Sequence, residues 1–337
     1  MRVLVTAVRV PTETRDAPAD VLDRLRGLLS CPLCHSHLSW ALDEARCDGC
    51  GAVFPILDRI PVLIADRAAS DHDELHQEYG HSHTTSGSHK DRQAAHFDRE
   101  MAAEFEITRP RGAARLYEWL LQEKFRRAVA PIRNRLAGGT ALVVCGGSGM
   151  DAEFLHDCGA AVITSDISLG AAKRALERAR RGGFDLLSIV ADVERLPFGD
   201  AVLDLAYVHD GLHHLERPEV GVVEMARVAR TVSVTEPARA AGTQLAVKLG
   251  IALQKEESGN VVARLRPKDV SAQLAKLGFR TLSRGRYLMY YPHEPGRLFG
   301  LLSRQGLFLL TRTSWRAGNA VLGRFGNKMT VVARRAD

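Results

Sequence analysis

The chain has 337 residues, of which 45% are hydrophobic and 26% charged, and its formal net charge is +6 at pH 7. This length and composition exclude a fibrous or disordered protein and allow one large domain plus a small one. Because 46 Lys and Arg residues are mixed with 40 Asp and Glu residues, the charge indicates a basic solvated surface and does not demand a nucleic-acid partner.

The apolar stretches bear on where the protein works. The apolar run in residues 1–16 is too short for a signal peptide. Later stretches at 245–253 and 298–310 are interrupted by Lys248 and Arg304, and neither is long enough to span a bilayer. We therefore expect a cytoplasmic protein with no membrane partner. The grouping of four of the six cysteines in a metal-binding pattern fits that expectation.

The first motif, residues 31–50, reads CPLCHSHLSWALDEARCDGC. Two C-x2-C knuckles, separated by twelve residues, supply Cys31, Cys34, Cys47 and Cys50. Four thiolates satisfy tetrahedral Zn²⁺ and leave no open coordination position, so we predict a structural zinc site. The alternative is a pair of redox C-x2-C units, which usually sit at a strand-to-helix junction, whereas this segment is short and rich in turns.

The next residues, GAVFPILDRIPVLI at 51–64, predict a strand, a turn and a second strand that close a small ribbon. With this tail, residues 28–65 resemble the small zinc-binding activator subunits of tRNA and rRNA methyltransferases and similar modules fused to methyltransferases. We assign residues 1–65 to an N-terminal zinc-ribbon domain.

Residues 66–100 are polar and contain six of the thirteen histidines. We predict a His-rich linker, because such tracts have no fixed metal geometry unless a fold supplies it. The alternative is a second metal site that uses either His72 and His76, one helical turn apart, or the pair His81 and His83 in HSH. Residues 101–136 then show leucines at helical spacing and are expected to form a helical lid on the main domain.

From residue 140 onward, predicted strands and helices alternate. The strands read TALVVC, AVITSD, LLSIVAD, LDLAYVHD and TVSVTEP. This alternation predicts an α/β, doubly wound, Rossmann-like sheet with its ligand cleft at the carboxyl ends of the strands. Residues 267–278 then predict a helix, 279–291 a strand, and 328–335 a last strand that follows a long apolar insert.

Glycines follow the first of these strands. Gly146, Gly147 and Gly149 let the backbone approach a ligand closely, and Asp166 ends the second strand, where a carboxylate can hold a ribose diol. Asp192 ends the third strand, where it could bond an adenine amino group. The combination predicts an adenosine-containing cofactor.

Two such cofactors compete for the loop. The run from Gly147 to Ala152 fits the dinucleotide pattern G-x-G-x-x-G/A. However, Asp151 and Glu153 open the next helix, where they would repel a pyrophosphate. S-adenosylmethionine carries a sulfonium and an ammonium, which tolerate nearby carboxylates, so we favour it.

These segments resemble the class I S-adenosylmethionine-dependent methyltransferases, specifically the group with D-x-x-x-L-P-F-x-D followed by LHHL. The matching segments are VVCGGSG, SDIS, ADVERLPFGDAVLDLAYVHDGLHHL and TEPAR, within residues 138–290. The resemblance implies a seven-stranded sheet. It also implies that the glycine loop wraps the methionine part, while the second-strand and third-strand acids hold ribose and adenine. The residues it assigns to the cofactor are Gly146, Gly147, Gly149, Asp166, Ile167, Asp192, Val193 and His209.

Two residues depart from the family pattern. Val143 stands where the family has an acidic residue, and Cys145 stands where it has its first glycine. The carboxylate that helps hold the methionine ammonium is therefore missing from its usual place. Asp151 is our first candidate to replace it and Asp210 the second, while a weakly bound or different cofactor is the alternative. We interpret Cys145 as a small buried residue at the turn, with a nucleophile as the alternative.

The loop after the fourth strand, VHDGLHHLERPE, is dense in titratable groups. We predict His213 or His214 as a catalytic base, with His213 favoured, because a histidine pKa lies near neutrality. The alternatives are a purely structural turn, or a metal site built by Asp210, His213 and His214. Further along, the candidates for lining an acceptor pocket are Tyr287, Tyr290, Tyr291 and His293.

The sequence thus predicts an S-adenosylmethionine-dependent methyltransferase whose acceptor is a small molecule, preferably a hydroxyl in biosynthetic or specialised metabolism. The Asn/Asp-Pro-Pro-aromatic motif of many nucleic-acid amino-group methyltransferases is missing, so an RNA base methyltransferase comes second. A non-catalytic binding protein with a degenerate loop comes third. We assign residues 101–337 to the methyltransferase domain, with a C-terminal insert and last strand at 291–337. The oligomeric state is left open.

Overall fold

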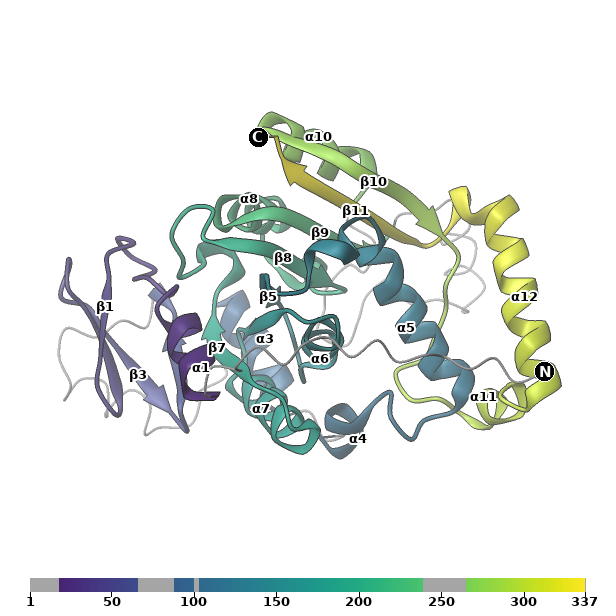
Figure 1. Ribbon diagram of the computed structural model, residues 1–337, viewed down its shortest axis with the longest axis horizontal. Helices are drawn as coiled ribbons and strands as arrows, with labels where there is room; N and C mark the ends of the chain where they lie inside the picture. Colours follow the sequence, from purple (N-terminus) through teal and green to yellow (C-terminus); the bar gives the residue numbers. More distant parts are fainter. Residues whose placement is uncertain (1–17, 66–87, 100–102, 239–264, 337) are drawn as a thin grey trace, which may run out of the picture.

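The computed structural model describes residues 18–65, 88–99, 103–238 and 265–336 (Figure 1). Residues 66–87, which hold most of the predicted His-rich linker and the two pairs His72 with His76 and His81 with His83, lie outside the described residues. His89 and His96 from the end of that segment lie on a helix, α3. The division into ribbon, linker and methyltransferase domain stays a prediction.

The strands and helices follow the predicted order closely from residue 140 onward. The strands are β1 (Leu38–Trp40), β2 (Glu44–Cys47), β3 (Val53–Leu57), β4 (Ile60–Leu63), β5 (Thr140–Val144), β6 (Ala161–Asp166), β7 (Leu186–Ala191), β8 (Leu203–His209), β9 (Ala229–Pro237), β10 (Phe279–Tyr287) and β11 (Lys328–Arg335). The α-helices are α1 (Pro18–Arg26), α3 (His89–Asp98), α4 (Ala103–Thr108), α5 (Arg115–Val129), α6 (Met150–Asp157), α7 (Leu169–Gly182), α8 (Pro218–Val228), α10 (Pro267–Lys276), α11 (Arg297–Leu302) and α12 (Gln305–Leu322). Short 3₁₀ turns are η2 (Ala130–Arg135), η3 (Val193–Arg195), η4 (Leu212–His214) and η5 (Gly323–Phe325).

The main sheet has the order β7-β6-β5-β8-β9-β11-β10. Its first five strands are parallel, and β11 pairs antiparallel with both β9 and β10. The predicted α/β, doubly wound, seven-stranded sheet is therefore confirmed.

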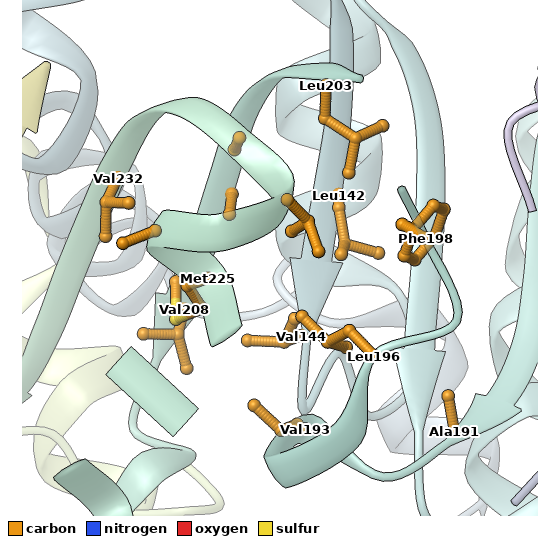
Figure 2. Close-up of a cluster of buried hydrophobic side chains, with 14 of the residues drawn as sticks. Leu142, Val144, Ala191, Val193, Leu196, Phe198, Leu203, Val208, Met225 and Val232 are labelled. Carbon is orange, nitrogen blue, oxygen red and sulfur yellow. The ribbon is translucent and has the colours of Figure 1, made fainter. Parts of the chain in front are cut away.

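Alternating side chains along the central strands point to opposite faces of the sheet, because successive residues in a strand do. On one face, Leu142 and Val144 of β5 join a cluster that includes Met225 of α8 (Figure 2). On the other face, Ala141 and Val143 pack among apolar side chains of α5, α6 and α7. Helices therefore cover both faces, as burial on both sides of a parallel sheet requires.

The zinc-ribbon segment joins this sheet at its edge. Its strands β1 to β4 form antiparallel neighbours, and β4 then pairs in parallel with β7, placing Val62 opposite Val190 and Leu63 opposite Ala191. One continuous 11-stranded sheet results. The turn between β3 and β4 is made by Asp58 and Arg59, both with positive φ, as a two-residue hairpin needs. The sequence predicted the hairpin but not its pairing with β7.

The long apolar insert folds as the helix pair α11 and α12, which lies beside α5 at one side of the molecule (Figure 1). Phe308 and Trp315 of α12 pack with Leu116, Leu120 and Trp119 of α5. Within the described ranges, none of the helices combines the length and apolar character that crossing a bilayer would take.

Candidate active site and metal centre

A cavity of about 330 Å³ lies at the carboxyl ends of β5, β6, β7 and β8. Helices α3, α4 and α5 and the segment after β10 contribute the other walls. The residues assigned to the cofactor that line it are Gly146, Gly147, Asp151, Asp166, Ile167, Asp192, Val193 and His209. Gly149 does not line it. Gly149 is the N-cap residue of α6, with φ +78°, and a Cβ at this position would lie 3.0 Å from the Cβ of Ala175.

The loop after β5 takes its shape from left-handed backbone. Cys145 has φ +50°, the region that favours glycine and costs another residue about 1–2 kcal/mol. A Cβ on Gly146 would lie 2.0 Å from Oγ1 of Thr164, whereas one on Gly147, at φ +52°, would meet nothing within 4 Å. Gly147 therefore faces open space in the cavity. Val143 is buried in the apolar cluster under α6, so no carboxylate reaches the cavity from its position.

Asp166 ends β6 and Asp192 follows the neighbouring strand β7, and the two lie at one end of the cavity. We call it the adenosine end, after the role that the sequence predicts for these two residues. Asp166 accepts hydrogen bonds from the N–H groups of Gly147, at 2.9 Å, and Ser168, at 3.0 Å. Burial raises the pKa of Asp166, while these two N–H groups act in the opposite direction. The carboxylate thus fixes the glycine loop while its edge faces the cavity.

Asp192 forms an ion pair with Lys90, a residue of helix α3. The ammonium of Lys90 contacts the Asp192 carboxylate and lies 3.5 Å from Glu194. The other Asp192 oxygen accepts the N–H of Glu194 at 2.9 Å. Helix α3 is held to α7 through Asp98, which accepts hydrogen bonds from Ser168 Oγ at 2.6 Å and Gly170 N at 2.7 Å.

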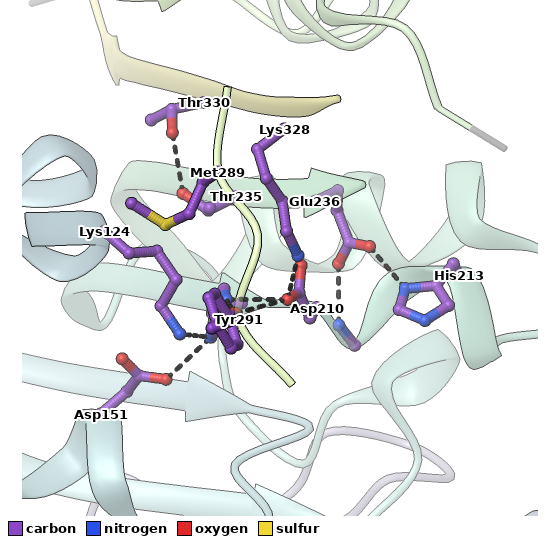
Figure 3. Close-up of polar contacts among 12 residues, drawn as sticks. Lys124, Asp151, Asp210, His213, Thr235, Glu236, Met289, Tyr291, Lys328 and Thr330 are labelled. Carbon is purple, nitrogen blue, oxygen red and sulfur yellow. Dashed lines mark hydrogen bonds and ion pairs between the residues drawn. The ribbon is translucent and has the colours of Figure 1, made fainter. Parts of the chain in front are cut away.

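At the opposite end, which we call the acceptor end, a buried lysine and Asp151 both contact His209 (Figure 3). Lys124 of α5 is fully buried and contacts Nδ1 of His209. Asp151 accepts hydrogen bonds from the Tyr207 hydroxyl, at 3.1 Å, and interacts with His209 Nδ1 at 3.2 Å. Burial lowers the pKa of Lys124 to about 8, although Asp151 and Asp210 act in the opposite direction.

A second carboxylate completes this cluster. Asp210 contacts the ammonium of Lys328 on β11 and accepts a hydrogen bond from the Tyr291 hydroxyl at 3.1 Å. The same hydroxyl lies 3.1 Å from Nε2 of His209. Burial would raise the pKa of Asp210, but Lys328 and Lys124 outweigh it and lower that pKa. In the described part of the chain no group bonds the buried Oδ1 of Asp210.

The two predicted bases lie in different surroundings. His213 is 2% exposed, and its Nδ1 lies 2.7 Å from Glu236, which also accepts the N–H groups of Gly211 and Leu212 at 2.8 and 2.7 Å. His214 lines the cavity and His213 does not. The turn is therefore held by a buried carboxylate at the end of β9, and the only one of the two histidines that reaches the cavity is His214. Tyr291 and His293 also line the cavity, whereas Tyr290 is 74% exposed and Tyr287 lies outside the wall.

Sequence reasoning missed three members of this site: Lys124, Lys328 and Glu236. Lys124 did carry a signal, because it lies at i+4 from Leu120 and i+3 from Leu121 on the apolar face of its helix. A charged residue on such a face needs a buried partner. Lys328 opens the last strand and carried no comparable signal.

The four predicted metal ligands do converge. The sulfur atoms of Cys31, Cys34, Cys47 and Cys50 all lie within 4.8 Å of one another. The Cys31–Cys50 and Cys34–Cys47 sulfur pairs are 3.7 and 3.4 Å apart, close to the ~3.8 Å edge of a tetrahedral zinc–thiolate site. Backbone N–H groups of Leu33 and Gly49 point at Cys31 and Cys47, at 3.3 and 3.4 Å.

Comparison with known proteins places residues 142–233 in a family described as a methyltransferase domain. The demethylmenaquinone methyltransferase of Renibacterium salmoninarum is 32% identical over 107 residues, which cover 32% of this chain and 44% of the relative. The one from Paenarthrobacter aurescens is 31% identical over 107 residues, covering 32% and 41%. The chain thus spans less than half the length of these curated relatives. The structure of magnesium protoporphyrin IX methyltransferase from Synechocystis PCC 6803 with bound SAH is 15% identical, with a TM-score of 0.48 over 74% of this chain and 100% of that one.

The matched segment begins in β5 and ends within β9, so it contains the glycine loop, Asp166, Asp192 and the turn with His213 and His214. Glu236, which holds that turn, lies just beyond the matched segment. The glycine loop, Asp166 and Asp192 are the parts that build the adenosine end. The similarity to methyltransferase domains is thus shown for residues 142–233.

Proposed function

We propose that the protein transfers a methyl group from S-adenosylmethionine to a small-molecule acceptor that gives up a proton. The observation that carries this proposal is a single cavity with two unlike ends. Carboxylates and a glycine loop line the adenosine end, and a buried lysine, a histidine and a tyrosine meet at the acceptor end. A methyltransferase needs both: a place for the cofactor and groups that orient and deprotonate the acceptor.

The residues present fit this cofactor. Gly147 leaves the loop open toward the cavity, and the Asp166 carboxylate stands where a ribose diol would donate two hydrogen bonds. The cofactor ammonium needs a buried anion, and Asp210 offers one, because its Oδ1 is buried and lacks a partner among the described residues. Both oxygens of Asp151 already interact with Tyr207 and His209. We therefore propose that Asp210 holds the ammonium and that Asp151 positions His209, reversing our first preference.

When bound, the cofactor supplies a methyl group on a sulfonium, which needs no further activation. Lys124 is placed to take the acceptor proton, because burial brings its pKa to about 8 and makes the neutral amine accessible near neutral pH. Tyr291 and His209 orient that amine and the acceptor through their mutual contact at 3.1 Å. His214, which also lines the cavity, stays the alternative base.

The relatives named demethylmenaquinone methyltransferases suggest the first acceptor to try. Demethylmenaquinone and simpler hydroxylated aromatic compounds are incubated with the protein and isotope-labelled S-adenosylmethionine. We expect transfer to at least one of them, and we expect calorimetry to show micromolar binding of S-adenosylhomocysteine. Wild-type protein that binds neither S-adenosylmethionine nor its demethylated product would overturn the proposal.

The carboxylate assignment has its own test. Asp210→Asn should weaken cofactor binding about tenfold, the usual size for one charge-assisted hydrogen bond. Asp151→Asn should lower kcat while leaving the Kd within about threefold. The reverse ranking of the two Kd values would return the role to Asp151.

We also propose that the four cysteines of the ribbon hold a structural Zn²⁺. Their sulfur geometry supports this, and so does Gly49, where a Cβ would lie 2.2 Å from Oγ of Ser36 inside the knuckle. Metal analysis should find one zinc per chain, and Cys31→Ser should lower the unfolding free energy by several kcal/mol. Cys158→Ser, which removes a half-buried cysteine outside the cluster, is the matched control. Fresh, reduced protein without bound metal would contradict the assignment.

A further inference from the structure

The pair α11 and α12 carries an unusual share of exposed apolar side chains. Eight of the fourteen exposed large hydrophobic residues in the described ranges lie between residues 298 and 325. They are Leu298, Leu301, Leu307, Leu309, Leu310, Val321, Leu322 and Phe325, with exposed fractions from 39% to 71%. Such a concentration of exposed apolar side chains on one pair of helices indicates an interaction site in a folded protein.

The exposed residues follow a helical stripe. On α12 the inward face is already used, since Phe308 is 3% exposed and packs with Trp119 of α5. Leu310, Ala317 and Val321 lie at i, i+7 and i+11, so they share the opposite face, and all three are exposed. Figure 1 shows α12 at one side of the molecule. No Asp or Glu interrupts that stripe, since the whole stretch from Pro295 to Ala336 contains none.

Charge on this pair of helices has one sign. Its five cationic residues are Arg297, Arg304, Arg312, Arg316 and Arg324. All are exposed except Arg312, which is half-buried. Counting only the parts of the chain that are described, no carboxylate lies within ion-pair distance of any of the five. Three of them instead lie over aromatic rings: Arg312 over Phe308 at 5.8 Å, Arg316 over Trp119 at 6.0 Å, and Arg324 over Phe325 at 4.7 Å.

We propose that the face formed by α11 and α12, residues 297–325, binds the surface of an anionic phospholipid bilayer. Leucines of the stripe would enter the boundary between headgroups and acyl chains, and the arginines would meet the phosphates, which is how amphipathic basic helices lie on membranes. The one-signed charge argues against a second copy of this chain, because the same face would meet its own arginines. The apolar stripe argues against RNA, for which arginines alone would suffice.

This face also adjoins the cavity. Phe299 of α11 packs against Tyr117 and belongs to the same apolar cluster as Tyr291 and Met150, both of which line the cavity wall. A bilayer on the α11–α12 face would therefore lie next to the acceptor end. The sequence-based expectation of no membrane partner rested on the lack of a spanning segment, which does not bear on helices that lie flat.

The test is sedimentation of the full chain with vesicles, an assay that does not depend on methyl transfer. We expect binding to vesicles of phosphatidylcholine mixed with phosphatidylglycerol, little binding to phosphatidylcholine alone, and weaker binding in about 1 M salt, where the Debye length falls to ~3 Å. Arg304→Gln and Arg316→Gln should each weaken binding about fivefold. The double variant Leu310→Glu/Val321→Glu should weaken it about a hundredfold.

Leu42→Glu is the matched control, because Leu42 is 96% exposed and lies on the ribbon, away from α11 and α12. This variant should bind vesicles as the wild type does. Circular dichroism checks that each variant is folded, and all substituted positions are exposed. Equal binding by the wild type and the double variant would overturn the proposal. It would equally be overturned by self-association that the double variant abolishes without any vesicle binding, or by tighter binding to unmodified tRNA than to the vesicles.

Discussion

The two ends of the cavity are built in different ways. The adenosine end comes mainly from one stretch of chain, in which the segments at the ends of β5, β6 and β7 meet at the same edge of the sheet, and Lys90 of α3 joins them at Asp192. The acceptor end draws Lys124 from a helix before the sheet and Tyr291 from a segment after β10, both contacting His209. The proposed cofactor site is therefore formed mostly by residues from neighbouring segments of the sequence. The proposed proton transfer, in contrast, depends on contacts between segments that are far apart in the sequence.

The largest effect is expected from replacing Lys124, which should impair the acceptor end and leave cofactor binding intact. Lys124→Met keeps the length and apolar stem of the side chain but cannot accept a proton. We expect kcat to fall about a thousandfold, within the range for a lost general base, while the Kd for S-adenosylhomocysteine changes less than about threefold. Lys268→Met, on the exposed side of α10, is the control. A comparable loss in both quantities would mean that the two ends are not separable.

The opposite substitution is Asp166→Ala. It removes the carboxylate that we propose faces the ribose and that accepts the N–H groups of Gly147 and Ser168, so the Kd for the cofactor should rise about a hundredfold. At saturating cofactor we expect kcat to stay within about threefold of the wild type. Calorimetry and initial rates measure the two quantities, with Glu177→Ala on α7 as the control. An unchanged Kd would remove Asp166 from the adenosine end.

The pH profile sharpens the role of the acceptor end. Because burial lowers the pKa of Lys124 to about 8, the amine is mostly protonated at pH 7 and mostly neutral at pH 9. A base works only in its neutral form, so kcat/KM should rise with pH and gain about tenfold between pH 7 and pH 9. The rise should vanish in Lys124→Met. A wild-type rate that falls over this range would contradict the assignment.

The smallest expected effect concerns Lys90. Its ammonium forms an ion pair with the Asp192 carboxylate, which we propose as the hydrogen-bond acceptor for the adenine amino group. The ion pair and the adenine would therefore compete for this carboxylate. Lys90→Gln should therefore tighten cofactor binding about threefold, because one competing ion pair is gone. The exposed Arg92→Gln on the same helix serves as a comparison. Weaker binding in Lys90→Gln would show that Lys90 itself contacts the cofactor.

The sequence predicted the fold of the methyltransferase part well, because buried strands such as LLSIVA alternate with helices that begin at clear caps, as at Ser168. The glycine loop and the acids after the strands were equally visible, since each follows directly from a strand end. Cys145 shows the limit of such patterns: its left-handed φ is what favours glycine there, yet cysteine adopts it.

The acceptor end was harder to foresee for a physical reason. Whether Lys124 is a solvated or a buried cation depends on how α5 docks, and docking is decided by packing partners hundreds of residues apart, such as Leu116 and Phe308. His213 and His214 are adjacent and chemically identical, so the sequence alone gives no physical reason to prefer one of them as the base. Only Glu236, from the next strand, distinguishes them.

The pairing of Leu63 with Ala191 gives the ribbon a second consequence. Ala191 is the residue before Asp192, so the strand that carries the adenine-side carboxylate is bonded on its outer edge to the cysteine module. If binding of the proposed Zn²⁺ stabilises β4, it also stabilises ligand binding at Asp192 through this pairing. Ligand binding would then raise the affinity for the metal by the same factor, because such linkage is reciprocal. If loss of the proposed Zn²⁺ unfolded β4, β7 would become a bare sheet edge, a template for pairing with other chains.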